Sequence, residues 1–218
     1  MGIWRDVICA FGIVSLLSLI AWRVSRKATL IPGRLQSALE LFAAGTDDFV
    51  CGILGPKGRR YTSFIGTLFI FILFMNLLVV IPFMKSPTAS WSTTLGLALC
   101  VFVYVQYSAI RELGFLGYLD HLMGKPRGIL AFSLVIPLLM FFMHIIGELI
   151  KPLSLSLRLR SNIWGDEMLM AIVAGFGLKG VILLFFNTII AITEGIIQAF
   201  VFGLLTTIYF AIYLVQEE

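Results

Sequence analysis

Six charged side chains interrupt an otherwise apolar stretch of the sequence and are its first candidates for chemistry: Glu148, Lys151, Arg158, Arg160, Asp166 and Glu167. Facing lipid at the bilayer centre, each would cost about 2.5 to 3.5 kcal/mol, and all six together about 15 to 21 kcal/mol. In a solvated loop, the alternating leucines of segment 152–159 would be exposed to water without a stabilising contact. We therefore expect a tilted membrane helix whose polar side lines water. A cytoplasmic loop between two spans is the alternative.

Helical spacing at 100° per residue separates the polar groups of this segment into two faces. One face carries Lys151, Ser154, Arg158 and Asn162, all within about 40° of one line. Arg160 and Glu167, seven residues apart, share the roughly opposite face, and Asp166 lies between the two. The opposite face has two interpretations, a structural Arg160–Glu167 ion pair or a functional role. Candidates for structural charges are Glu148, Lys151 and Arg160.

A second apolar stretch, near the C-terminal end, carries Glu194 and Gln198, four residues apart and therefore on one helical face. An ionisable group within a span usually marks an ion path, which favours a functional role for Glu194. For Gln198, a polar contact that holds two helices together is a serious alternative.

The composition places these charges in a membrane protein with little mass outside the bilayer. Of the 218 residues, 60% are hydrophobic and only 13% are charged, and the mean hydropathy is +1.02. Soluble domains are nearer half apolar and a quarter charged, so we exclude a soluble enzyme, a disordered chain and a disulfide scaffold. The net charge of +4 is spread along the chain, which argues against a nucleic-acid patch. The two histidines and three cysteines stand apart, so we expect no metal site and no cofactor.

The apolar runs predict an all-α polytopic membrane protein with five membrane-embedded helices and one amphipathic surface helix. Residues 1–31 would form a transmembrane helix with a basic flank, and residues 32–60 the surface helix with its connection. Residues 61–127 would hold two transmembrane helices and a cytoplasmic loop from residue 111, and residues 128–218 a tilted helical hairpin. The run 181–215 would be roughly 50 Å long as a helix against a core of about 30 Å, so it must tilt or bend.

Basic residues outside the apolar runs predict the orientation. With the N-terminus outside, segments 23–60 and 111–127 face the inner side and hold seven and three Lys or Arg residues. The outer side holds three, Arg5, Lys85 and Lys179. This asymmetry follows the positive-inside rule and places the C-terminus inside.

The segment Lys-Pro-Leu-Ser-Leu-Ser-Leu-Arg-Leu-Arg-Ser-Asn, residues 151–162, resembles the signature of subunit a of F-type ATP synthases. Residues 65–78 resemble the family's third helix, and segments 197–202 and 205–209 resemble its last helix. The resemblance covers most of the chain from Pro32 onward. It implies a non-catalytic, proton-translocating stator beside a ring of c subunits, assembled with peripheral-stalk b subunits and the rest of the ATP synthase complex. The implied location is an energy-coupling membrane, the bacterial inner membrane in particular.

Carried over position by position, the resemblance gives roles to Arg158 (the essential arginine), Asn162 (its partner asparagine), Glu167 (the acidic or histidine channel position) and Gln198 (the glutamine facing the arginine). The sequence also departs from the family's pattern. Arg160 and Ser161 replace the usual Phe and Gly, and Ala191 stands where many members carry an acid or a histidine. The resemblance therefore implies a rewired entry route, in which Asp166 or Glu194 supplies the acid.

The combined expectation is a pair of offset half-channels that load and unload carboxylates on the ring, with Asp166, Glu167 and Glu194 on the outer side. A self-contained secondary ion transporter is the alternative and would carry an internal repeat. An intramembrane enzyme would need a nucleophile with a base, or a metal cluster. We find neither pattern in the sequence. The choice between proton and sodium stays open, because the ion ligands would lie mainly on the ring.

Overall fold

The computed structural model describes residues 2–26, 33–78, 88, 90–122 and 132–214. These residues form helices and no strand: α1 (Gly2–Arg26), α2 (Arg34–Leu54), α3 (Arg59–Leu77), α4 (Trp91–Leu122), α5 (Phe132–Ala174) and α6 (Val181–Leu214). Short 3-10 turns, η1 (Pro56–Gly58) and η4 (Gly177–Gly180), precede α3 and α6. The all-α prediction is confirmed for this part of the chain. Parts of the predicted segments that fall on 27–32, 79–87, 123–131 and 215–218 lie outside the described residues.

Among the residues that the structure describes, four helical segments are long and apolar enough to cross a membrane: Pro56–Leu77, Trp91–Gly114, Leu138–Val173 and Val181–Tyr213. The apolar part of α1, Ala10–Arg23, is shorter than these. A polytopic membrane protein is thus confirmed, and the count of five membrane helices stays a prediction. The helix α2 occupies the segment expected to lie on the membrane surface, and that placement also stays a prediction.

The predicted loop from residue 111 is wrong for residues 111–122, because α4 extends to Leu122. Gly114 bends this helix with φ 71° and ψ 162°, a backbone conformation that glycine adopts without strain. One of the charges that suggested a loop, Glu112, has its partner on another helix. Arg60 Nη1 lies 2.9 Å from Glu112 Oε1, so the end of this span is tied to the start of α3.

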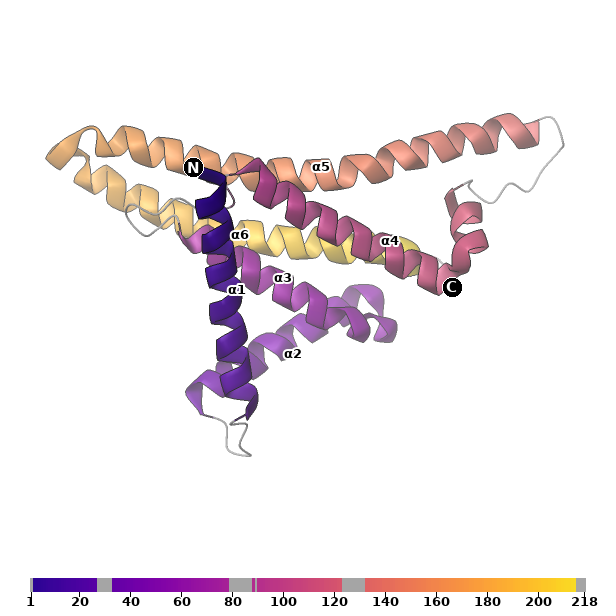
Figure 1. The fold of residues 1–218 in the computed structure, drawn as a ribbon, viewed down its shortest axis with the longest axis horizontal. Helices are drawn as coiled ribbons and strands as arrows, with labels where there is room; N and C mark the ends of the chain where they lie inside the picture. Colours follow the sequence, from indigo (N-terminus) through magenta and orange to yellow (C-terminus); the bar gives the residue numbers. More distant parts are fainter. Residues whose placement is uncertain (1, 27–32, 79–87, 89, 123–131, 215–218) are drawn as a thin grey trace.

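Two helices in the C-terminal half, α5 and α6, are the longest of the described elements, and η4 joins them into an antiparallel hairpin (Figure 1). With 43 and 34 residues they are about 65 and 51 Å long, well beyond a hydrocarbon core of about 30 Å. Both lengths fit the expected strong tilt. The helix α6 lies between α5 and α3, and α4 packs against both members of the hairpin (Figure 1).

Aromatic side chains fill the core where α3, α4 and α6 meet. The Tyr61 ring stacks on Phe210 with centroids 4.5 Å apart, and the Phe64 and Tyr104 rings are 4.3 Å apart. At the other end of this contact, Gly195 lets α3 approach α6 closely, because an added Cβ there would lie 3.3 Å from Asn76 Cβ. Buried Asn76 donates to the Gly195 carbonyl at 3.3 Å. The core therefore fixes α6 from one side and leaves its other side to α5.

Candidate functional site

Most of the predicted site residues lie where α5 packs against α6, and they meet in one constant antiparallel register. Asn162 Nδ2 donates to Gln198 Oε1 at 3.1 Å. Four residues further along α5, Asp166 faces Glu194, which is four residues back along α6. Eleven residues in the opposite direction, Lys151 Nζ lies 5.3 Å from the centre of the Tyr209 ring. Polar side chains thus follow the hairpin interface for much of its length.

Arg158 lies one helical turn before Asn162 and is exposed on the surface of α5. The exposed surface of α5 also carries apolar side chains on either side of it along the chain, including Leu153, Leu157 and Trp164, which are 39% to 50% exposed. By helical spacing the exposed Ser154 and Ser161 lie nearer to Arg158 than these do. Within the part of the chain that the structure describes, Arg158 has no hydrogen bond and no carboxylate partner. A guanidinium is protonated at every physiological pH. The fold therefore presents a permanent positive charge on an apolar face.

Asp166 and Glu194 form a pair of carboxyl groups between the two helices. Asp166 is 6% exposed, and its Oδ2 atom has no hydrogen-bond partner among the described residues. Two carboxyl groups this close can share one proton, because two adjacent negative charges repel each other. Ala191 is buried on the same side of α6, where it offers no polar atom. The half-buried Glu167 follows Asp166 about 100° further round α5.

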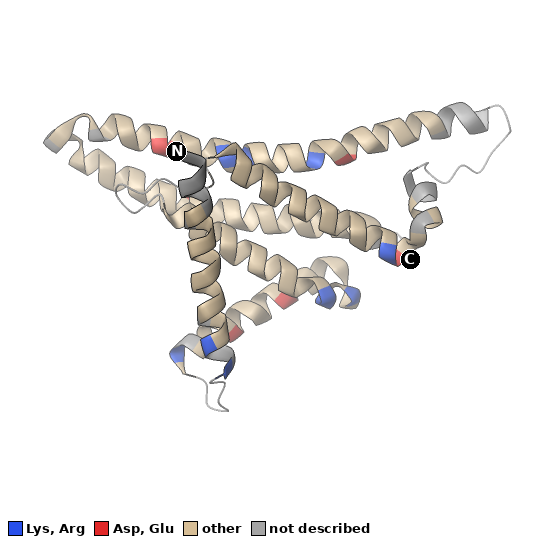
Figure 2. Ribbon diagram, in the orientation of Figure 1, with Lys and Arg blue, Asp and Glu red and all other residues tan. Residues whose placement is uncertain are grey.

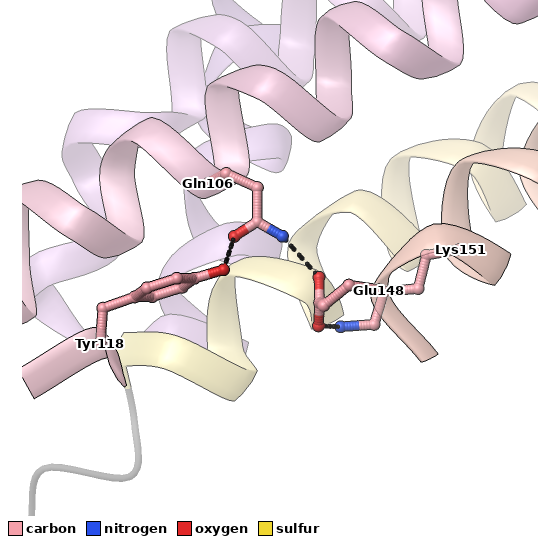
Figure 3. A network of polar contacts seen from close by, with 4 residues as sticks. All are labelled: Gln106, Tyr118, Glu148 and Lys151. Atoms are coloured by element: carbon pink, nitrogen blue, oxygen red, sulfur yellow. Dashed lines mark hydrogen bonds and ion pairs between the residues drawn. The ribbon is translucent and has the colours of Figure 1, made fainter. Parts of the chain in front are cut away.

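A polar network on the other side of Arg158 connects α4 and α5 (Figure 3). Glu148 accepts hydrogen bonds from Gln106 Nε2 at 2.7 Å and from Lys151, and Tyr118 donates to Gln106 Oε1 at 2.8 Å. Burial, followed by the charge of Glu148, raises the pKa of the Tyr118 phenol, so this hydroxyl stays protonated and keeps its donor role. Lys151 also lies over the ring of Tyr213 at 5.5 Å. Glu148 and Lys151 are therefore satisfied inside a network.

Arg160 lies on another side of α5, over the face of Trp91 at the start of α4. The guanidinium carbon is 4.6 Å from the ring centre, a cation–π distance, and buried Nε has no hydrogen-bond partner among the described residues. This aromatic partner was missed from the sequence. The Arg160–Glu167 ion pair stays a prediction. Figure 2 shows the charged residues of α5 spread along the middle of the helix.

Sequence reasoning missed several polar residues of this region. Gln106 interrupts an apolar span much as Gln198 does, and that same signal would have found it. Asn187, seven residues before Glu194, shares the face of Glu194 and is 3% exposed. The sequence does not single out Tyr118 and Tyr213 as members of a polar network, because tyrosine is common at the ends of membrane spans.

Comparison with known proteins agrees with this arrangement. The family model described as ATP synthase A chain matches residues 7–211. The chain belongs to this family. Its resemblance to subunit a of F-type ATP synthases is thereby confirmed, and members of the family are non-catalytic membrane subunits.

Bacterial relatives named ATP synthase subunit a match nearly the whole chain. The Protochlamydia amoebophila protein is 37% identical over 98% of this chain and 82% of its own length. The Moorella thermoacetica protein is 39% identical over 96% of this chain and 90% of its own length. A protein of Syntrophotalea carbinolica named ATP synthase subunit a 1 is 39% identical over 96% of this chain and 86% of its own length.

Proposed function

We propose that this chain is the ion-translocating stator of a rotary ATP synthase and forms two offset half-channels separated by Arg158. The observation that carries the proposal is the position of Arg158. It is exposed on an apolar face of α5, without a hydrogen bond or carboxylate partner among the described residues, and buried polar pairs lie on each side of it. A permanent charge in that position favours the ionised form of any carboxylate that approaches it.

The outer half-channel in this proposal follows the α5–α6 interface from Glu194 and Asp166 to Gln198 and Asn162. Asp166 Oδ2 and Gln198 Nε2 are buried with no hydrogen-bond partner among the described residues. Buried polar atoms of this kind are usually satisfied by water. Glu167, half-buried next to Asp166, completes the group of entry acids. Protons reach the ring carboxylate here and, after nearly a full turn of the ring, leave on the inner side.

The surface that carries Arg158 also indicates which partner subunits this chain would contact. The exposed apolar face that carries Arg158 suits a ring of c subunits, whose carboxylates would pass the guanidinium in turn. Peripheral-stalk b subunits would hold the chain against rotation within the complete ATP synthase. The location in this proposal is the bacterial inner membrane, because the similar proteins named above come from bacteria. Each proton that crosses is worth about 2.3 kcal/mol per 100 mV of membrane potential.

The experiment is purification followed by transport in sealed vesicles. We expect the chain to co-purify with a c ring and a stalk, and ATP to drive ion uptake only when this chain is present. Repeating the assay with and without sodium separates proton from sodium transport. Ion transport by the purified chain alone would support a secondary transporter instead and would contradict the proposal.

A further inference from the structure

We infer that Asn187 is an additional polar step of the outer half-channel, one that binds water between the outer surface and the Asp166–Glu194 pair. This inference rests on the proposed function. The first observation is that the side-chain amide of Asn187 is buried but makes no hydrogen bond among the described residues. Asn187 is 3% exposed, and neither its amide nitrogen nor its amide oxygen has a hydrogen-bond partner among the described residues.

The position of Asn187 on α6 connects it to the candidate path. It lies seven residues before Glu194 and eleven before Gln198, which places all three on one helical face. The register that pairs Asn162 with Gln198 and Asp166 with Glu194, continued seven residues further, brings Asn187 opposite Val173 of α5. Val173 is buried and apolar, so the interface offers Asn187 no side-chain partner there.

The unsatisfied atoms form an ordered series along the interface. From the η4 end inward they are both amide atoms of Asn187, then Asp166 Oδ2, then Gln198 Nε2. A side-chain amide left without partners in an apolar contact costs stability, and native proteins usually satisfy such groups with water. A chain of waters touching these atoms would connect the two carboxyl groups to the outer side. Among these waters, Asn187 orients its neighbour with the amide NH2 group as donor and the amide oxygen as acceptor, and it does not itself carry a proton.

Replacing Asn187 with an apolar residue distinguishes a water-binding role in the half-channel from a purely structural role. Asn187→Leu removes both unsatisfied atoms, so a complex carrying it should assemble normally and melt at the same or a higher temperature. Proton flow through the membrane sector should nevertheless fall severalfold, because the path loses its polar lining. Asn187→Ser keeps a hydroxyl that binds water and should conduct better than Asn187→Leu. A purely structural asparagine predicts the reverse, lost assembly with normal conduction per complex.

The decisive experiment is chemical accessibility in the whole complex. In a background with Cys9, Cys51 and Cys100 replaced by serine, Asn187→Cys is exposed to a membrane-impermeant, cationic methanethiosulfonate reagent, which reacts with the thiolate and therefore needs water. The control is Ile190→Cys, on the exposed apolar side of the same helix. We expect Asn187→Cys to be labelled from the outer side and Ile190→Cys to be unreactive.

Two results would overturn the inference: no labelling of Asn187→Cys above the Ile190→Cys level, or a normal proton flux in Asn187→Leu. Both differ from a failure of the proposed function, which would appear as a wild-type complex that translocates no ions. The labelling result stands whichever way the transport assay turns out.

Discussion

Asn162 donates a hydrogen bond to Gln198 across the α5–α6 interface at 3.1 Å, one turn beyond Arg158. The bond uses the Asn162 amide nitrogen and leaves Gln198 Nε2 buried without a partner among the described residues. The pair holds two amides in a fixed orientation next to the arginine without neutralising it. In the same antiparallel register, Asp166 meets Glu194.

Breaking this bond should affect ion flow more than assembly. A single hydrogen bond contributes about 0.5 to 1.5 kcal/mol, too little to unfold a helical hairpin. Asn162→Leu and Gln198→Leu should each slow ATP-driven pumping severalfold, and the double variant should be little slower than the worse single one, because contacting residues are not additive. The measurement is pumping in vesicles at matched complex content. Exposed Ser161→Ala is the control, and fully additive losses would show that the two amides act independently.

Glu194 should supply the entry acid in place of the missing group at Ala191. Glu194→Gln removes one carboxyl of the Asp166–Glu194 pair. ATP synthesis should therefore slow severalfold or more and change its dependence on the outside pH. The control is Glu112→Gln, a carboxylate paired with Arg60 away from this interface. An unchanged rate and pH profile in Glu194→Gln would leave Asp166 and Glu167 as the entry acids.

Arg160 should stabilise the complex through its contact with Trp91. Cation–π contacts contribute about 0.5 to 2 kcal/mol, depending on how far they are desolvated. Arg160→Leu and Trp91→Leu should both lower the yield of assembled complex, whereas Trp91→Phe keeps a ring face and should lower it less. The readout is c-ring recovery in purified complexes. Normal assembly of Arg160→Leu with lost proton transport would instead place Arg160 in the mechanism.

The Glu148–Lys151 pair should behave as a buried ion pair within its network. Removing one partner of such a pair typically costs about 3 to 5 kcal/mol, because the other charge is left uncompensated. Glu148→Gln should therefore lower the melting temperature of the complex, and Glu148→Gln combined with Lys151→Met should recover part of the loss. Thermal unfolding of the purified complex measures both. Equal stability of the wild type and Glu148→Gln would contradict a structural role for this pair.

The sequence predicted the helical architecture well because long apolar runs have few other solutions in a membrane. It also predicted a tilted membrane helix through the segment with six charges, and α5 is continuous from Phe132 to Ala174, through Pro152. The predicted loop is wrong at the end of α4, where polar residues continue as helix to Leu122. There, Arg60 pairs with Glu112 over a distance of 52 residues in the sequence, which no local pattern reveals.

The candidate site could be predicted from the sequence only where its residues lie on one helix. Spacing along one helix identified Arg158 and Asn162 as neighbours on one face, and that required only helical geometry. Partners on other helices depend on packing. Trp91 over Arg160 and Gln106 beside Glu148 are contacts that only the tertiary structure shows. The face shared by Asn187 and Glu194 was visible in the sequence, but the lack of partners at Asn187 was not.

The central claim is that the fixed charge of Arg158 separates the two half-channels, and ATP-driven proton pumping by reconstituted Arg158→Ala complexes tests it most directly. Without the guanidinium, nothing favours the ionised ring carboxylate or repels a proton that crosses directly. With assembly verified by c-ring recovery, we predict no pumping and a passive proton leak through the assembled complex. Arg158→Lys, which keeps a cation but loses the planar fork, should also fail to couple. Robust ATP-driven pumping by assembled Arg158→Ala complexes would contradict the account.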